Sequence, residues 1–229
     1  MLSQILLRDV ESYATRLRES SLLTRAKTRA LPPEAIGLYL AGLRYLTHAG
    51  VQLLSRAADC ADRKADEGIA DHLRKKLEEE VGHYRWADND IHNLERLFKI
   101  RVGRQASPAL RNLMAFLADE IDARPAHFLA YTLLVEHVTV VVGPEWLETL
   151  ERHSGVLPSN LSIVRNHVEL DREHVEEGLT DIDLLVDPAD LDGMRRTIRT
   201  SSEHLDAFFG EVAHRAFAPQ PTMSNVTFA

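Results

Sequence analysis

The sequence has a single cysteine, few aromatic residues and no excess of basic residues. Because Cys60 stands alone among 229 residues, an internal disulfide is excluded and a reducing compartment such as the cytoplasm is expected. Lysine and arginine number 27 against 35 aspartates and glutamates, and the net charge is −8, so we expect no nucleic-acid partner. The N-terminus also lacks the basic start and unbroken apolar core of a signal peptide.

Long apolar runs are missing as well. The longest, residues 129–142, is interrupted by threonines, a glutamate and a histidine, and it falls short of the roughly 20 apolar residues that cross a bilayer. We therefore expect a soluble protein that does not bind or span a membrane. The chain is long enough to bury a large core, and we expect one domain over residues 1–218. Residues 219–229 are mostly polar and aperiodic, which predicts a disordered tail.

Apolar residues recur at helical spacing almost throughout, and the alternation typical of strands is missing. The sequence therefore predicts an all-α, single-domain bundle of about seven to eight helices. Prolines and capping residues mark where these helices begin. Besides an N-terminal helix, the expected helices cover about residues 33–61, then 62 or 66 to 98, one from 108, one from 125, a short one from 145, 158–185 and 187–217, with a break at Gly143-Pro144.

Polar residues inside apolar stripes are the strongest functional signal. On a helical wheel of residues 161–185, Asp171 falls near the centre of a stripe of valine, leucine and isoleucine, with His167 and His174 on the same side. Their i, i+4, i+7 spacing stacks the three side chains on one face over two helical turns. Three ionisable groups in a core stripe need a physical reason.

Two other segments place acids in an apolar stripe. In the helix that ends near residue 98, Glu80 falls close to the centre of the stripe and His83 lies at its edge, while Glu79 falls off it. Glu136 is the only residue with an obligatory charge in the apolar stretch 126–142, and a carboxylate that deep costs several kcal/mol unless it is compensated. Because no lysine or arginine falls near the centre of these stripes, we expect metal ions to supply the positive charge.

The polar residues in these stripes are carboxylates and histidines contributed by separate helices, a combination that suits two first-row metal ions, and iron or manganese better than zinc. The predicted ligands are Glu80, His83, Glu136, His167, Asp171 and His174. A structural interpretation stays open for each residue alone; Glu136, for example, could accept hydrogen bonds from Tyr131 or His137. The joint pattern favours a metal site. Other histidines, including His72 and His127, are interpreted as surface or capping residues.

These residues resemble those of the haem-oxygenase-like di-iron oxidases and oxygenases, which share their helical fold with thiaminase II and pyrroloquinoline-quinone synthase. The resemblance covers most of the chain from Leu31 to Leu185, and its most specific part is the last of four motifs. The motifs are Leu31-Pro-Pro-Glu-Ala-Ile-Gly-Leu-Tyr-Leu, Glu79-Glu-Val-Gly-His83-Tyr-Arg-Trp86, Leu134-Val-Glu136-His and His167-Val-Glu-Leu-Asp171-Arg-Glu-His174.

The resemblance implies an enzyme that binds two ferrous ions, often weakly, and uses O2 to oxidise a small molecule. Known chemistries in the group include oxidative carbon-carbon cleavage of fatty acids or amino acids, desaturation, N-oxygenation and nitrile formation, commonly in specialised metabolism. Carried over, the six residues above would be ligands, although Glu79 could replace Glu80 and a Mn/Fe pair could replace two irons. Glu136 and His137 are the expected catalytic residues, with Tyr84 as a further candidate for orienting a ligand. A homodimer is also possible.

Two other functional classes compete with this interpretation. A ferritin-like iron-handling protein would use similar ligands, but it predicts two Glu-x-x-His elements, whereas here the second element is Asp171-x-x-His174 preceded by His167. A non-catalytic helical scaffold would pair the polar groups with one another. The haem-binding and thiaminase branches fit poorly, because no proximal histidine stands near the N-terminus and Cys60 has no base near it in sequence.

Overall fold

The computed structural model describes residues 1–218, so the predicted tail at 219–229 lies outside the described residues. Within them the chain is all-α, without a strand, as predicted. The helices in chain order are α1 (Leu2–Arg18), α2 (Ser21–Ala26), α3 (Pro33–Arg63), α4 (Glu67–Glu80), α5 (Tyr84–Phe98), α6 (Pro108–Ala123), η1 (Pro125–His127), α7 (Phe128–Ser154), η2 (Pro158–Asn160), α8 (Ser162–Leu185), η3 (Pro188–Asp190) and α9 (Leu191–Phe217).

Most helix starts lie where the sequence predicts them. Proline occupies the first turn of α3 and of α6, where its missing N–H is not needed. Asp66, rather than Asp62, caps α4 by accepting a hydrogen bond from the Ile69 amide. Ser107 caps α6 in the same way through the Ala109 amide. The prolines at 125, 158 and 188 each open a short 3-10 turn that leads into the next long helix.

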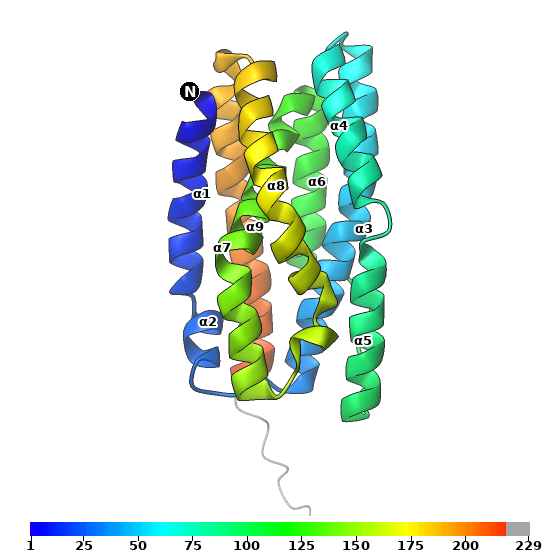
Figure 1. Ribbon diagram of the computed structural model, residues 1–229, viewed down its shortest axis with the longest axis vertical. Coiled ribbons are helices and arrows are strands. Elements are labelled where there is room, and N and C mark those ends of the chain that lie inside the picture. The colour runs from blue at the N-terminus through cyan, green and yellow to red at the C-terminus, as the bar shows by residue number, and fades with distance from the viewer. Residues whose placement is uncertain (219–229) are drawn as a thin grey trace, which may run out of the picture.

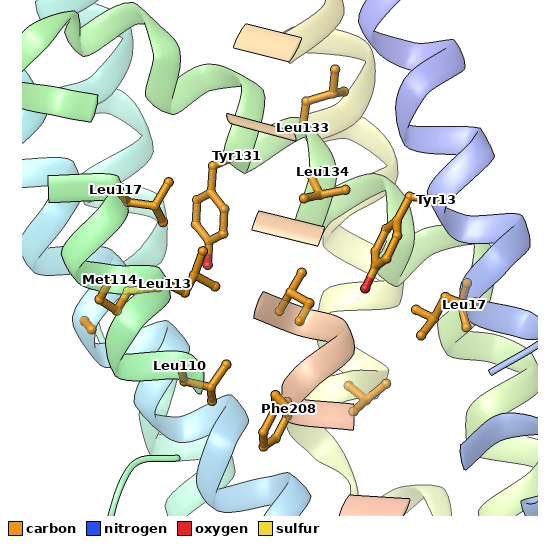
Figure 2. Packing of buried hydrophobic residues seen from close by; sticks show 14 of the residues in the cluster. Tyr13, Leu17, Leu110, Leu113, Met114, Leu117, Tyr131, Leu133, Leu134 and Phe208 are labelled. Atoms are coloured by element: carbon orange, nitrogen blue, oxygen red, sulfur yellow. The ribbon is translucent and has the colours of Figure 1, made fainter. Parts of the chain in front are cut away.

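The long helices run roughly along one axis of an elongated bundle, and α4 and α5 follow one another along the side formed by α3 (Figure 1). One hydrophobic core fills the bundle. Figure 2 shows part of it, in which Tyr131 of α7 lies beside Leu113 and Leu117 of α6, and Leu134 of α7 lies on the side of Tyr13 of α1. The central helix α7 contacts α1, α6, α8 and α9, so its side chains face the core on several sides.

The segment formed by η1 and α7, Pro125–Ser154, is long and apolar enough to cross a membrane by length and composition. However, 61% of its most apolar window is buried inside the protein. A central helix surrounded by other helices has this composition for the same reason that a membrane span does, because its neighbours replace water on most sides. The apolar composition of Pro125–Ser154 is therefore consistent with a mostly buried core helix of the bundle.

The helix expected to end near residue 98 is not continuous, which corrects the prediction. The chain leaves the α conformation at Val81, and Gly82 has a φ of +97°, which side chains other than glycine rarely adopt. A new helix, α5, begins at Tyr84. This break lies between Glu80 and His83, so the two residues are held by a turn and not by successive turns of one helix.

The predicted break at Gly143-Pro144 is also wrong, since α7 continues through Pro144 to Ser154. A proline inside a helix leaves the carbonyl four residues earlier, here that of Val140, without its N–H donor, and its ring crowds the preceding turn. Here the Arg18 side chain of α1 donates a hydrogen bond to the Val141 carbonyl, three residues before the proline. Gly143 packs directly against Val168 of α8. Tertiary contacts thus stabilise a helix that local sequence rules would end.

Candidate metal centre

The predicted ligands come together from the junction of α4 and α5, from α7 and from α8. Glu80, Glu136, His167 and Asp171 all line one internal cavity. His83 and His174 contact these residues from the edge of the cavity. They form two donor groups with different surroundings.

The first donor group consists of Glu80, His83 and His167, and it has the geometry of a metal site. Nitrogen and oxygen atoms from the three side chains all lie within 4.8 Å of one another. Glu80 Oε2 is 3.0 Å from His83 Nδ1 and 3.7 Å from His167 Nε2. Burial alone would raise the pKa of Glu80, but hydrogen bonding to His167 and His83 holds that pKa well below its usual range. Glu80 is therefore an anion between two imidazoles.

The imidazole rings of this first donor group are held in place by their neighbours. His167 Nδ1 donates a hydrogen bond to the Ile163 carbonyl at 2.6 Å, which leaves Nε2 directed to Glu80. The Trp86 indole stacks on His83 with a centroid distance of 4.1 Å and meets His167 edge-on at 5.4 Å. A metal-binding imidazole usually donates its other nitrogen to a carbonyl or carboxylate in this way. The first donor group thus fits a divalent metal ion.

The second donor group consists of Glu136, Asp171 and His174, and it is buried more deeply. His174 Nδ1 lies 3.5 Å from Asp171 Oδ1 and 4.0 Å from Glu136 Oε1. Asp171 is 2% exposed, and its Oδ1 and the His174 Nδ1 have no hydrogen-bond partner among the described residues. Burial raises the pKa of Asp171, and it raises that of Glu136 to about 7, although Lys76 partly opposes the shift. Two buried oxygens and an imidazole nitrogen with lone pairs and only long contacts to one another would fit a cation.

The sequence-based expectation that no lysine approaches these acids is wrong. Lys76 of α4 is 3% exposed, and its Nζ lies 3.0 Å from Glu136 Oε1. A signal for this placement was present: Leu73, Lys76, Leu77 and Glu80 follow an i, i+3, i+4, i+7 pattern, which puts the lysine on the apolar stripe. The charge of Glu136 is therefore balanced by a protein side chain.

Glu79 and Glu80, the two alternative ligands of the sequence analysis, lie beside different donor groups. Glu80 faces the first donor group. Glu79 Oε2 lies 3.5 Å from His174 Nε2 and 3.4 Å from Lys76 Nζ. This oxygen atom is buried and has no hydrogen-bond partner among the described residues, although the Glu79 residue as a whole is half-buried. Both glutamates thus point toward the candidate site, each toward one half of it.

Two predicted helper residues are not brought to the donor groups. His137 follows Glu136 on α7 but has Glu11 and Arg18 of α1 as its charged neighbours, and burial lowers its pKa. The Tyr84 ring packs edge-on against His48 at 5.1 Å. Two histidines interpreted as surface residues are instead paired with acids. His72 Nδ1 lies 2.7 Å from Asp181, and the buried His127 Nδ1 lies 2.9 Å from Glu120.

The cavity beside the donor groups has a volume of about 210 Å³ and is mostly apolar. Apart from Lys76 and the three acids and one histidine named above, its walls are formed by aliphatic and aromatic residues and a few threonines and glycines. Along α7 the lining includes Glu136, Val142 and Trp146. Ten helical residues span about 15 Å, so the cavity extends well beyond the donor groups.

Similar solved structures share this architecture. A domain of unknown function with a haem oxygenase-like fold from Shewanella denitrificans superposes with a TM-score of 0.77 at 16% identity, covering 93% of this chain and 91% of that one. A CADD-like protein of unknown function from Nostoc punctiforme superposes with a TM-score of 0.70 at 19% identity, covering 94% of this chain and 95% of that one. A TenA homolog from Pseudomonas syringae superposes with a TM-score of 0.70 at 18% identity, covering 93% of this chain and 92% of that one.

No protein-family model matches the sequence, and no curated protein matches it. At these identities the structural likeness shows the fold alone. The chain has the haem oxygenase-like fold, and its chemistry has to be argued from its own residues.

Proposed function

We propose that this protein is an O2-dependent non-haem di-iron oxidase or oxygenase acting on a small molecule. The observation that carries the proposal is the convergence of six nitrogen and oxygen donors beside a largely apolar cavity. Glu80, His83 and His167 would hold one ferrous ion, and the second donor group would hold the other. When bound, the metal pair supplies the ability to activate O2 for oxidation of the substrate.

The cavity favours a substrate with an extended apolar part. Its walls beyond the donor groups offer aliphatic and aromatic surface with few hydrogen-bonding groups. A free amino acid would leave its polar groups unpaired there, which costs binding energy. Of the two substrate classes that the sequence suggested, we therefore favour a fatty-acid-like carboxylate over an amino acid. The apolar walls would also exclude water from the reacting centre.

The rival interpretation with the most structural support is a scaffold without metal. Lys76 pairs with Glu136, and Glu80 pairs with His83, so part of the cluster is balanced by protein groups alone. That interpretation has to pair Asp171 Oδ1 with His174 Nδ1, which lie 3.5 Å apart, farther than in a good hydrogen bond. A ferritin-like role is less well supported, because the donor groups face an apolar cavity suited to an organic molecule.

The decisive experiment is anaerobic loading with Fe(II), a count of bound iron, and then rapid mixing with O2 in the presence of fatty acids or amino acids. We expect iron to bind, and an optical transient to appear with fatty acids of suitable length. The His83→Ala and His174→Ala variants should each lose iron. His204→Ala, which changes a histidine outside both donor groups, is the control. Wild-type protein that binds no iron and gives no transient with any compound would rule out the proposed activity.

A cytoplasmic location is part of this proposal. Cys60 is a free, buried thiol whose Sγ contacts the Ile121 carbonyl at 3.3 Å. A lone reduced cysteine is typical of proteins that work in a reducing compartment. We also propose that the enzyme acts without a nucleic-acid or membrane partner, and a homodimer stays a possibility to be tested by sedimentation.

A further inference from the structure

Lys76 lies where the second donor group would need positive charge. Its Nζ is 3.0 Å from Glu136 Oε1 and 3.4 Å from Glu79 Oε2, and the residue is 3% exposed. A buried ammonium is retained only where nearby anions balance it. The two glutamates come from different helices, α4 and α7, so the lysine joins them across the site.

We propose that Lys76 is a resident cation of the second donor group and that a second divalent metal ion binds there only by displacing it. This inference rests on the proposed function, because it assumes that the two donor groups bind metal. The first donor group has no lysine among its close ion pairs, whereas Glu136 and Glu79 both lie within ion-pair distance of Lys76. The two ions therefore bind in order, first at Glu80, His83 and His167.

The displacement follows from space and charge. A divalent ion that contacts Glu136, Asp171 and His174 would lie close to the present position of the Lys76 ammonium, and two cations so close repel strongly in a buried site. The lysine has a flexible four-carbon stem, and its side chain also lines the apolar cavity, so it can move without a change in the backbone. Asp171 Oδ1 and His174 Nδ1, which are held only by a long contact of 3.5 Å to each other, are then available to the incoming ion.

The test is titration with Mn²⁺, which needs no oxidant, by calorimetry and electron paramagnetic resonance at one fixed pH. In wild type we expect one ion to bind more tightly than the other. Lys76→Met removes the charge but keeps a flexible side chain of similar length, and it should tighten the second ion by at least about tenfold while leaving the first unchanged. Lys75→Met is the matched control, because this neighbouring lysine is exposed, pairs closely with Glu177 at 2.7 Å and reaches Glu79 only at 3.8 Å. It should change either affinity by less than about threefold.

The outcomes separate this inference from the proposed function. If wild type and all variants bind no Mn²⁺, the metal proposal itself fails. If wild type binds Mn²⁺ and His83→Ala abolishes the tight site, but Lys76→Met leaves the second affinity unchanged or weaker, only the role of Lys76 is overturned. If Lys76→Met fails to fold, Lys76→Gln replaces it, because its amide can still donate a hydrogen bond to Glu136. This variant should also bind the second ion more tightly than wild type does.

Discussion

Gly143 of α7 and Val168 of α8 approach so closely that a Cβ on residue 143 would lie 2.5 Å from Val168 Cγ2. Gly143 follows Glu136 by seven residues, or about two turns, on α7. Val168 lies between His167 and Asp171 on α8. The contact fixes the separation of the two helices that carry most of the candidate ligands. A side chain at position 143 would therefore act on the donor groups without being one of them.

Gly143→Ala should destabilise the protein and disturb the site. Overpacking against a β-branched side chain costs about 1–3 kcal/mol, whereas alanine gains about 1 kcal/mol of helix propensity, so we expect a net loss of up to about 2 kcal/mol. Urea unfolding measures this change in the free energy of unfolding. In Gly178→Ala, on α8, the new Cβ would meet no atom within 4 Å, so that variant should gain stability. Equal gains in both variants would contradict the close approach.

Asp90 positions the start of α8, although 72 residues separate it from Ser162 in sequence. This buried carboxylate of α5 accepts hydrogen bonds from the Ile163 amide at 2.9 Å and from the Ser162 hydroxyl at 2.7 Å. The Ile163 carbonyl in turn accepts the hydrogen bond from His167. Asp90 thus helps to position the candidate ligand His167 through Ile163.

Asp90→Ala should lower the free energy of unfolding by about 2 kcal/mol, because it removes a helix cap and leaves a buried amide unpaired. It should also weaken Mn²⁺ binding, because α8 loses its fixed starting point. Asp88→Ala is the control on the same helix, since Asp88 forms only partly exposed ion pairs with Arg44 and Arg104. It should cost less than about 1 kcal/mol. If both variants bound Mn²⁺ like wild type, Asp90 would have a purely structural role.

Features that depend on local chemistry were predictable from the sequence. Proline and capping residues marked the beginnings of α3 and α6, and the wheel position of Asp171 predicted its burial, because a helix of regular pitch fixes which residues share a face. Glu136 was predicted to be buried for the same reason, since nearly all its neighbours along the chain are apolar.

Features that depend on contacts between distant segments were not predictable in this way. An isolated glycine within a helical pattern is usually tolerated, so the break at Gly82 depends on how the two segments pack against α3. The continuation of α7 through Pro144 depends on contacts with Arg18 and Val168. The wheel position of Lys76 beside Leu73 and Leu77 could have indicated its burial, but its pairing with Glu136 of another helix depends on the fold.

His72 gives the protein a stability that depends on pH. Burial lowers the pKa of His72, and the hydrogen bond to Asp181 opposes this shift only in part. The unfolded chain, with a histidine pKa near about 6.5, therefore binds a proton more readily than the folded chain does. The stability from neutral His72 is complete above that pH and is lost as the pH falls through the folded-state pKa.

His72→Gln should therefore reduce the dependence of stability on pH. Glutamine can still donate to Asp181, so at pH 7.5 the variant should lose only about 1 kcal/mol. Between about pH 7.5 and 5.5 its unfolding free energy should fall less than that of wild type, by up to about 1 kcal/mol. Urea unfolding in the presence of a chelator makes the comparison without bound metal. Parallel pH profiles for the two proteins would show that His72 is not the responsible group.

Gly50 offers a way to test the cavity without touching a candidate ligand. It lies on α3 and lines the cavity, and a Cβ built there would meet no atom within 4 Å. A leucine at this position can therefore enter the cavity without displacing the core. Because leucine also has a higher helix propensity than glycine, the variant should fold at least as well as wild type.

Gly50→Leu should weaken the binding of a long-chain fatty acid by at least about tenfold, since the chain and the new side chain need the same space. Binding of a shorter acid should change less, and Gly50→Ala should lie between wild type and the leucine variant. Both variants should keep the wild-type Mn²⁺ stoichiometry. The measurement is displacement of a fluorescent fatty acid at equilibrium. Undiminished long-chain binding by Gly50→Leu, with metal binding intact, would mean that the apolar substrate part does not occupy this cavity.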